Sequence, residues 1–284
     1  MKIHFTKMHG AGNDYIYINC FEYKIDDPND LSILISDRHK GIGGDGIVLI
    51  CPSDKADAQM RMFNIDGSEG AMCGNAIRCV AKFIYDNNYA HKNVVTIDTK
   101  SGIKTIEIES ENDKFIGAKV DMGKAIFTPK DIPMLYDGEY FINQPLDVCG
   151  KTYLCTAVST GNPHCVTFVD DVDSIDLEKI GPMFENHPIF PDRVNTEFIQ
   201  IIDENNIRMR VWERGSGETL ACGTGSCAAT AASVLNGYCR RNTPISVHLR
   251  GGILTDTFKD DNTVIMEGNA IKVFEGVIDT DDLE

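Results

Sequence analysis

The chain has 284 residues, and its 42% hydrophobic and 25% charged content is typical of a folded globular protein. Its formal net charge of −16 excludes the broad basic surface with which proteins bind nucleic-acid phosphates. No apolar run is long enough to cross a bilayer, and His4 and Lys7 interrupt the stretch in which a signal peptide would be continuously apolar. We therefore expect a cytoplasmic protein that binds neither nucleic acid nor a membrane.

Short β-rich segments precede one long helical segment in each half of the chain. In the first half the residue pattern predicts strands at 14–19, 47–50 and 59–63 and a helix at 75–85. In the second half it predicts strands at 165–169 and 207–212 and a helix at 225–235. Both helical segments end at turn residues, Asn87-Asn88 and Asn236-Gly237. A last strand at about 271–278 is expected to return to the first half.

The two halves share an internal repeat. Gly12-Asn13 recurs as Gly161-Asn162, and Cys73-Gly74 recurs as Cys222-Gly223, each at an offset of 149 residues. The same offset brings four more residues onto identical ones without a gap: Ile50 onto Ile199, Met60 onto Met209, Arg61 onto Arg210 and Glu69 onto Glu218. A duplication explains this common register better than a chance match of unrelated loops.

The repeat predicts an α+β fold of two pseudo-symmetric domains. Each domain is expected to be a mixed, mostly antiparallel sheet wrapped around a central helix, with the active site in the cleft between the domains. We place the N-terminal domain at 1–123, completed by 268–284, and the C-terminal domain at 124–267. The boundary is set near Gly123 because Pro and Asp become frequent after it.

The ten cysteines are expected to be free thiols in a reducing cytoplasm. They include no Cys-x-x-Cys, and their spacings do not suggest zinc, so we expect no bound metal. Most are expected to be small buried hydrophobic residues, among them Cys20, Cys51, Cys149 and Cys239.

Cys73 and Cys222 differ from the others because each lies just ahead of a predicted helix. Unpaired N–H groups and the helix dipole favour anions there, so a thiol in this position is expected to have a lowered pKa. Epimerisation needs a base on one face of the α-carbon and an acid on the other. A thiolate and a thiol, one from each half, would supply both. The amides at the two helix starts would hold the substrate carboxylate as negative charge builds on it.

No sequence motif indicates a cofactor. Residues 41–46 match Gly-x-Gly-x-x-Gly formally, but strand-like residues follow instead of a helix, so a tight turn is the better interpretation. Residues 215–217 lack the spacing of a hydrolase nucleophile elbow, and the sequence has no P-loop. The sequence alone leaves a pyridoxal-phosphate lysine open but singles none out.

At these residues the sequence resembles the diaminopimelate epimerases. The resemblance covers nearly the whole chain, through 7–15, 41–46, 63–75, 159–165, 194–195 and 212–225. It implies conversion of LL-diaminopimelate to the meso form, in the synthesis of lysine and peptidoglycan precursors, without pyridoxal phosphate or metal. It also implies two pseudo-symmetric α/β domains and a homodimer.

The resemblance further implies roles for single residues. Cys222 would accept the α-proton and Cys73 would donate one in the LL-to-meso direction. The backbones of Gly74-Asn75 and Gly223-Thr224 would hold the reacting carboxylate, and His164 with Glu213 would position the reacting groups. Substrate contacts would come from Asn13, Asn64, Asn162, Asn195, Glu213 and Arg214, whose amides and charges suit a substrate with two amino-acid ends. Some family members carry Gln where Gly46 stands, so that side-chain contact is missing here.

Three other functions fit part of the pattern. A sister epimerase of the same fold could act on histidine or proline derivatives, but these lack the distal group that Asn64, Asn195 and Arg214 would bind. A thiol hydrolase using one cysteine with His164 would leave the second cysteine unexplained. A non-catalytic binding protein for diamino acids would need no paired thiols.

Overall fold

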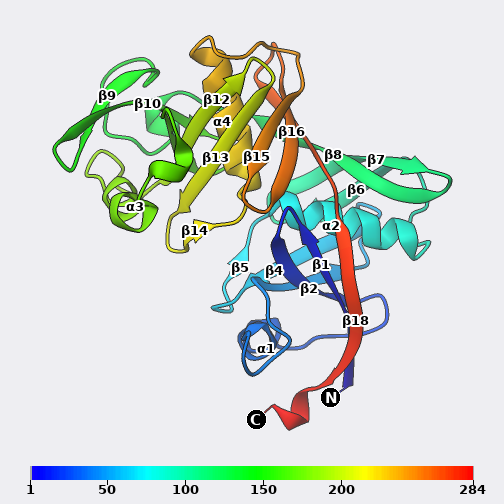
Figure 1. Cartoon of the computed structure of the whole chain (residues 1–284). Helices are drawn as coiled ribbons and strands as arrows, with labels where there is room; N and C mark the ends of the chain where they lie inside the picture. Colours follow the sequence, from blue (N-terminus) through cyan, green and yellow to red (C-terminus); the bar gives the residue numbers. More distant parts are fainter. Residues whose placement is uncertain (1, 284) are drawn as a thin grey trace. The chain divides into compact units, whose positions relative to one another are not determined.

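The structure, a computed structural model, describes residues 2–283 and forms two compact units (Figure 1). Unit 1 combines the chain up to Val120 with the segment from Gly268 onward, and unit 2 is Asp121–Glu267. The division falls within strand β8 (Lys114–Lys124), a few residues before the Gly123 position chosen from composition. Composition does not mark the division because the strand runs through it without a turn.

Unit 1 is a mixed sheet in which neighbouring strands follow the order β18-β1-β2-β3-β4-β6-β7-β8. The β2–β3 and β4–β6 pairs are parallel, the other pairs are antiparallel, and the short β5 pairs with β4. The strands are β1 (Lys2–Gly10), β2 (Asn13–Asn19), β3 (Gly46–Cys51), β4 (Ala58–Asn64), β5 (Glu69–Gly70), β6 (Val94–Thr99), β7 (Gly102–Glu111), β8 and β18 (Ile271–Asp279).

Unit 2 has the same succession of parallel and antiparallel pairs, with the order β9-β10-β11-β12-β13-β15-β16-β17, but its outer strand β9 directly precedes β10 in the chain, whereas β18 comes from the C-terminal segment. Its β11–β12 and β13–β15 pairs are parallel, and the short β14 pairs antiparallel with β13. The strands are β9 (Gln144–Val148), β10 (Lys151–Ser159), β11 (Pro163–Phe168), β12 (Asn195–Asp203), β13 (Asn206–Glu213), β14 (Gly217–Thr219), β15 (Ile245–Leu249), β16 (Gly252–Phe258) and β17 (Thr263–Gly268).

The two sheets repeat each other residue by residue over their central strands. Ile50 pairs with Met60 in unit 1, and the corresponding Ile199 pairs with Met209 in unit 2. The two units have the same succession of parallel and antiparallel pairs around these strands. The prediction of two similar halves with mixed, mostly antiparallel sheets is therefore confirmed.

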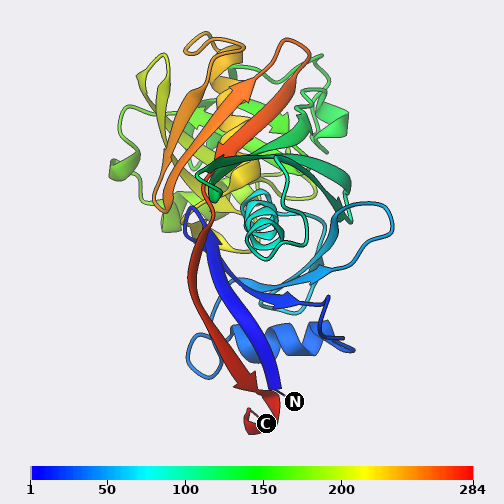
Figure 2. The ribbon, with the colours of Figure 1, turned by 90° about the vertical axis from the view of Figure 1, so that its right-hand side faces the viewer.

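Each unit contains one long buried helix of 13 residues, α2 (Gly74–Asp86) in unit 1 and α4 (Gly223–Leu235) in unit 2. Figure 2 shows α2, in cyan, viewed close to its axis between the blue and the green strands of unit 1, whose β1, β2, β4, β6 and β7 it contacts. The helix α4 is rich in Ala, Ser, Thr and Gly, whose small side chains let β10–β13, β15 and β16 approach it closely. Both helices begin close to their predicted positions.

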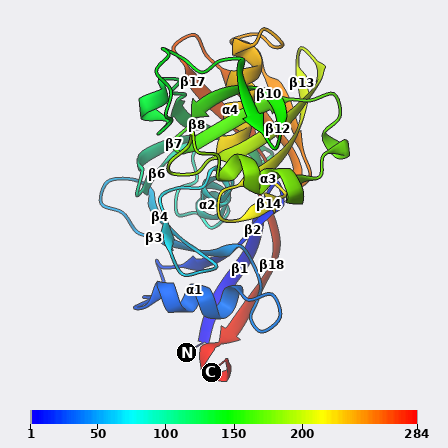
Figure 3. The ribbon, with the colours of Figure 1, turned by 90° about the vertical axis from the view of Figure 1, so that its left-hand side faces the viewer.

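Two shorter helices flank the sheets, and the sequence did not predict them. The helix α1 (Pro28–Ser36) begins after Asp27, whose side chain caps it, and packs on β3 and β4 (Figure 3). The helix α3 (Leu177–Glu185) begins after a capping Asp176 and packs on β9 and β12–β14. Three 3-10 turns complete the elements: η1 (Pro129–Asp131), η2 (Val172–Ser174) and η3 (Thr280–Asp282). Within residues 2–283 the helices are all too short or too polar to span a membrane.

The ten cysteines are free thiols, but not all are buried. Cys239 is buried as predicted, whereas the prediction is wrong for Cys20, Cys51 and Cys149. Cys149 is exposed because it lies in the tight turn between β9 and β10, with a φ of 51°. Cys20 and Cys51 are half-buried because they lie at the ends of strands.

Candidate active site

Cys73 is the N-cap residue of α2, in an extended conformation just before the first helical residue. Its carbonyl accepts a hydrogen bond from the Ile77 N–H, and its thiol lies 3.3 Å from Oδ1 of Asn13. The residue is half-buried. The N–H groups of Gly74 and Asn75, in the first turn, have no acceptor within the helix and are placed to bind an anion.

Cys222 occupies the equivalent N-cap position of α4. Its sulfur accepts a hydrogen bond from the Gly225 N–H at 3.3 Å and lies 3.4 Å from Oγ1 of Thr224. Only 5% of the residue is exposed. The first-turn N–H groups of Gly223 and Thr224 again have no acceptor within the helix. Each repeated unit thus places one thiol beside a helix start that favours anions.

The surroundings of Cys222 raise its pKa well above the ordinary value. Burial is the largest cause, and the negative charges of Glu213 and Glu197 add to it. The hydrogen bonds from Thr224 and Gly225 lower the pKa, but by less. The lowered pKa expected from the helix start is therefore wrong for Cys222, because burial and two carboxylates outweigh the helix amides.

His164, on β11, is fully buried and joins two polar side chains. Its Nδ1 lies 2.7 Å from Oε1 of Glu197, and its Nε2 lies 2.9 Å from Oδ1 of Asn162. Glu197 is fully buried too, and burial raises the pKa of its carboxyl group. Sequence reasoning missed Glu197. Its position on an apolar strand, two residues after Asn195, was the available signal.

Glu197 also lies close to Cys222, with Gly225 between them. A Cβ atom at Gly225 would lie 2.7 Å from Oε1 of Glu197 and 3.2 Å from the sulfur of Cys222. The position therefore has no room for a side chain, whereas the first half carries Ala76 at the equivalent position. The second oxygen of Glu197 is buried and has no hydrogen-bond partner among the residues that the structure describes.

Asn13 is held by charged residues at the start of β2. Its Nδ2 donates to Asp45 Oδ2 at 2.7 Å, and the same oxygen accepts the Asp14 N–H at 3.1 Å. Arg38 bridges Asp14 at 2.7 Å and Asp45 at 2.9 Å, and Lys7 pairs with Asp14 at 2.6 Å. This cluster fixes the amide next to Cys73. Sequence reasoning missed it, although Asp45 lies in the glycine-rich segment 41–46.

The segment 41–46 is a tight turn, as its sequence predicts. Gly46 ends it with a φ of 152°, and a Cβ atom there would lie 2.0 Å from the carbonyl oxygen of Phe63. No side chain fits at Gly46 with this backbone. The turn instead brings the side chain of Asp45 to Asn13.

Asn75 is fixed by Arg78, the largest fully buried side chain among the described residues. Arg78 donates to Oδ1 of Asn75 at 2.7 Å and to the carbonyl of Gly74 at 2.9 Å. It also donates to the carbonyl of Asn269 at 3.2 Å. Arg78, which sequence reasoning also missed, therefore holds the first turn of α2.

Asn195 and Arg214 are in direct contact. Oδ1 of Asn195 accepts the Arg214 N–H at 2.9 Å, and its Nδ2 donates to the carbonyl of Pro163 at 3.2 Å. The Arg214 guanidinium donates to the carbonyl of Asp192 at 2.9 Å. Arg214 is half-buried, so part of its side chain is open to a ligand.

The other two predicted contacts lie near short turns. Glu213, at the end of β13, accepts a hydrogen bond from the Thr219 hydroxyl. Asn64, at the end of β4, donates to Oγ of Ser68 at 3.0 Å, within its own turn. The structure thus joins Asn13 to Cys73 directly, whereas Asn64 contacts a neighbour in its turn.

An ion pair precedes each cysteine by the same number of residues. Arg61 pairs with Glu69 at 2.8 Å, and the equivalent Arg210 pairs with Glu218 at 2.8 Å. Each pair links the central strand β4 or β13 to the short strand that leads into the cysteine. The ion pairs therefore restrain the segment that carries each thiol.

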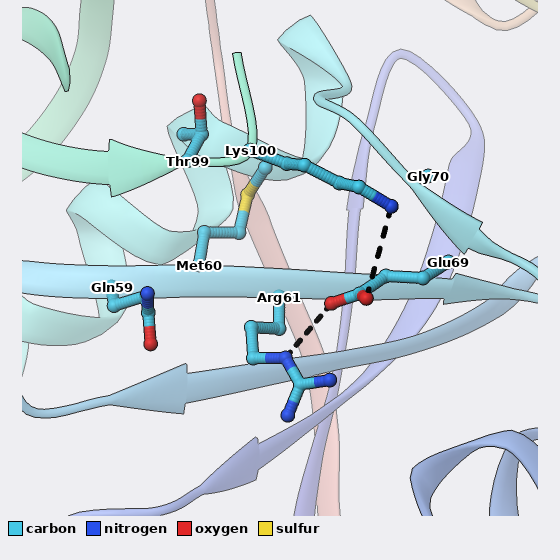
Figure 4. Close-up of a pocket in the computed structure, with 7 residues that line it drawn as sticks. All are labelled: Gln59, Met60, Arg61, Glu69, Gly70, Thr99 and Lys100. Atoms are coloured by element: carbon cyan, nitrogen blue, oxygen red, sulfur yellow. Dashed lines mark hydrogen bonds and ion pairs between the residues drawn. The ribbon is translucent and has the colours of Figure 1, made fainter. Parts of the chain in front are cut away.

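A second cation lies near the glutamate of each ion pair, and its distance from the glutamate differs between the two units. Lys100 lies 3.9 Å from Glu69, whereas Arg250 lies 2.8 Å from Glu218. Figure 4 shows Lys100 and Glu69 lining a pocket of about 210 Å³ that contains none of the predicted site residues. Within residues 2–283 no group of three or more His, Cys, Asp and Glu side chains is placed to hold a metal ion.

Known proteins resemble this chain over nearly its whole length. The family model described as Diaminopimelate epimerase matches residues 5–128 and 156–273. A protein of Acetivibrio thermocellus named diaminopimelate epimerase is 52% identical over 279 residues, covering 98% of this chain and 99% of its own. A protein of the same name from Methanococcus maripaludis strain C6 is 53% identical over 276 residues, and the match covers 97% of this chain and 99% of that protein.

Solved structures of low sequence identity share the fold. A Bacillus anthracis phenazine biosynthesis protein of the PhzF family has a TM-score of 0.72 at 16% identity, covering 98% of this chain and 99% of its own. A hydroxyproline epimerase from Agrobacterium vitis, with bound trans-4-hydroxy-L-proline, has a TM-score of 0.69 at 13% identity. The match covers 98% of this chain and 91% of that protein. At these identities the similarity establishes the fold alone.

Proposed function

Because the chain belongs to the diaminopimelate epimerase family, we propose that it interconverts LL-2,6-diaminopimelate and meso-2,6-diaminopimelate by moving the α-proton between Cys222 and Cys73. The chain is an isomerase that acts as an amino-acid epimerase. One observation carries the two-cysteine mechanism. Both thiols are N-cap residues at equivalent points of two repeated units.

In the LL-to-meso direction, the Cys222 thiolate removes the α-proton and the Cys73 thiol delivers a proton to the opposite face of the carbon. The reaction leaves Cys222 as a thiol and Cys73 as a thiolate, so the reverse reaction begins from Cys73. The raised pKa of Cys222 supports its role as base, since the thiolate of a weaker acid accepts a proton from carbon more readily.

The amides at the two helix starts hold the reacting carboxylate. The N–H groups of Gly74-Asn75 and Gly223-Thr224 would donate to its oxygens, and the positive ends of both helix dipoles favour the charge that builds there. The contacts from Arg78 support this assignment, because they fix Asn75 and the Gly74 carbonyl.

The remaining contacts set the choice of substrate. His164 and Glu213 position the reacting groups, and the contact between Glu197 and His164 supports a fixed orientation of that ring. The contact between Asn195 and Arg214 supports their assignment to one subsite, for the distal carboxylate. The substrate contacts we propose are Asn13, Asn64, Asn162, Asn195, Glu213 and Arg214.

The wider setting is proposed on the same basis. The reaction serves lysine and peptidoglycan-precursor synthesis in the cytoplasm, and the enzyme works as a homodimer without cofactor or metal. The functional halves are 1–123 with 268–284, and 124–267, and each contributes one of the two thiols. The resemblance and the internal repeat support this division.

The test is incubation with LL-diaminopimelate in heavy water. We expect meso product that carries deuterium at the inverted carbon, while the remaining LL substrate stays largely unlabelled at early times, because abstraction and delivery use different thiols. Chiral chromatography with mass spectrometry measures both quantities. Inversion without deuterium uptake, or equal turnover of proline, would contradict the proposal.

A further inference from the structure

Cys20 and Cys51 are neighbours in unit 1. Asn19 pairs with Ile50 between the parallel strands β2 and β3, and the Cys20 N–H donates to the Ile50 carbonyl at 2.8 Å. The next step of this register places Cys20 beside Cys51, the last residue of β3. Both side chains pack against the same hydrophobic cluster, so they lie on the same face of the sheet. Neighbouring strands lie about 5 Å apart, within the Cα separation that a disulfide needs.

The two thiols interact with each other and with a cation. A hydrogen bond between them lowers the pKa of Cys51 and raises that of Cys20. Arg61 lowers the pKa of both thiols, and it lies on their face of the sheet because it pairs with Leu49, two residues before Cys51. The guanidinium also pairs with Glu69 at 2.8 Å. Cys51 is therefore the more acidic thiol of the pair.

The chain contains a second pair of hydrogen-bonded thiols, and the two pairs differ in their exposure to solvent. Cys20 and Cys51 are half-buried, so a small molecule in solution can reach them. Cys155 and Cys165, on β10 and β11, also have hydrogen-bonded thiols, but both are fully buried. Their own hydrogen bond, burial and the charge of Glu197 raise the pKa of Cys165. The chain thus contains an accessible thiol pair beside a cation and an inaccessible pair beside a carboxylate.

We propose that Cys20 and Cys51 form a reversible disulfide when the protein meets a hydroperoxide. With hydrogen peroxide, the Cys51 thiolate attacks one oxygen, the O–O bond breaks, and Cys51 sulfenic acid and hydroxide form. The Cys20 thiol then attacks the Cys51 sulfur, the S–O bond breaks, and water leaves. The two thiols supply two electrons to the peroxide. A dithiol reductant restores them by exchange.

This modification site is separate from the proposed active site. Cys20 follows the end of β2, whereas Asn13, which contacts Cys73, begins that strand. Strands advance about 3.3 Å per residue, so roughly 20 Å separates the two places. The disulfide should therefore leave epimerase activity unchanged. It should raise the unfolding temperature, because it closes a loop in the unfolded chain.

The experiment exposes the reduced full-length protein to an equimolar amount of hydrogen peroxide, blocks the remaining thiols and maps the peptides by mass spectrometry. We expect a Cys20–Cys51 linked peptide to accumulate several-fold faster than any Cys155–Cys165 link, and to disappear with dithiothreitol. Exposed Cys149 serves as the control for a thiol that is accessible but lies in a turn. Cys20 and Cys51 remaining as accessible to blocking as before treatment would overturn the proposal.

Single variants test the order of the two steps. Cys20→Ser should leave Cys51 as a sulfenic acid that dimedone labels, whereas Cys51→Ser should leave Cys20 unlabelled. Arg61→Gln should slow formation of the link several-fold while Cys149 oxidises at its usual rate. Equal dimedone labelling in both serine variants would refute the assignment of Cys51 as the attacking thiol. Loss of epimerase activity in step with the Cys20–Cys51 link would refute its separation from the active site.

Discussion

Nδ1 of His164 lies 2.7 Å from Oε1 of Glu197, and both side chains are fully buried. This contact holds the imidazole ring in one orientation, in which the other ring nitrogen, Nε2, forms a hydrogen bond with Asn162. It also keeps a carboxylate next to Cys222, where its charge disfavours the thiolate. One side chain thus orients His164 and makes Cys222 a weaker acid.

Replacing Glu197 by Gln should therefore shift the reactivity of Cys222 to lower pH. The thiol pKa is raised in the native protein, so alkylation of Cys222 by iodoacetamide should be slower than that of an ordinary thiol at the same pH. Removal of the negative charge favours the thiolate, so Cys222 in Glu197→Gln should be alkylated faster than in the native protein at any given pH. Mass spectrometry of the Cys222 peptide across pH measures this, with Cys239 in the same digest as reference. An unchanged Cys222 profile would show that the carboxylate does not control the thiol.

Gly225→Ala should disturb the same site by crowding. The new methyl group would meet Glu197 at 2.7 Å and the Cys222 sulfur at 3.2 Å, so one of them must move. We expect a loss of about 1–3 kcal/mol in the free energy of unfolding, as for other overpacked sites, together with a fall in kcat of about 100-fold. Chemical denaturation and steady-state kinetics measure the two effects.

A double variant supplies the control for Gly225→Ala. Truncation of the carboxylate in Glu197→Ala makes room for the methyl group, so the stability losses of the two single variants should not add in the double variant. Losses that add fully would mean that the methyl group and the carboxylate do not meet.

The sequence predicted the parts of this protein that repeat or that follow local rules. The register of the two halves is visible in the sequence because Cys73 and Cys222 are separated by the same 149 residues as the other repeated positions. The two helices were predicted because Gly and a polar residue follow each cysteine at the start of a helical pattern. Asp45 and Glu197 were missed because each acts on a residue more than thirty positions away, and only the sheet brings them together. The pKa of Cys222 was mispredicted for a similar reason. A helix start is a local feature, whereas burial is a property of the folded unit.

Replacing the glutamate of the ion pair before Cys222 should lower stability and kcat more than replacing the glutamate of the pair before Cys73. Arg210 and Glu218 are 10% and 11% exposed, whereas Arg61 and Glu69 are 39% and 27% exposed. Glu218→Gln should therefore cost about 2 kcal/mol in the free energy of unfolding and lower kcat. Glu69→Gln should change both less, because water already screens that pair. Equal losses in the two variants would contradict the ranking by exposure.

Loss of either thiol should stop the reaction. Cys73→Ala and Cys222→Ala should each lower kcat at least about 100-fold, because each removes an acid or base that the transition state requires. Serine variants should remain strongly impaired, since a hydroxyl is a far weaker acid than a thiol. Formation of the meso product, followed by chiral chromatography, measures activity and an unchanged circular-dichroism spectrum measures folding, with Cys149→Ala as control. Near-normal turnover by either alanine variant would exclude the two-base mechanism.

Arg214 should determine how the enzyme recognises the distal end of the substrate. Its guanidinium presents a planar pair of donors that matches two carboxylate oxygens, and its backbone is fixed by Asn195. Loss of this contact in Arg214→Ala leaves a desolvated carboxylate without its partner, which typically costs about 2–5 kcal/mol in kcat/KM. Lysine should restore only part of this, because it lacks the planar fork. Since remote contacts also position the α-carbon, kcat should fall as KM rises.

L-Lysine provides the matched substrate for this test, because it is diaminopimelate without the distal carboxylate. The native enzyme should exchange its α-proton poorly, and Arg214→Ala should lower that rate little further, because the missing carboxylate and the missing guanidinium remove the same interaction. Arg240→Ala, at an arginine whose side chain is 77% exposed, should leave both substrates unaffected. Deuterium uptake by each substrate gives all the rates. If Arg214→Ala slowed lysine exchange as much as diaminopimelate epimerisation, Arg214 would act on the reacting end of the substrate rather than on the distal carboxylate.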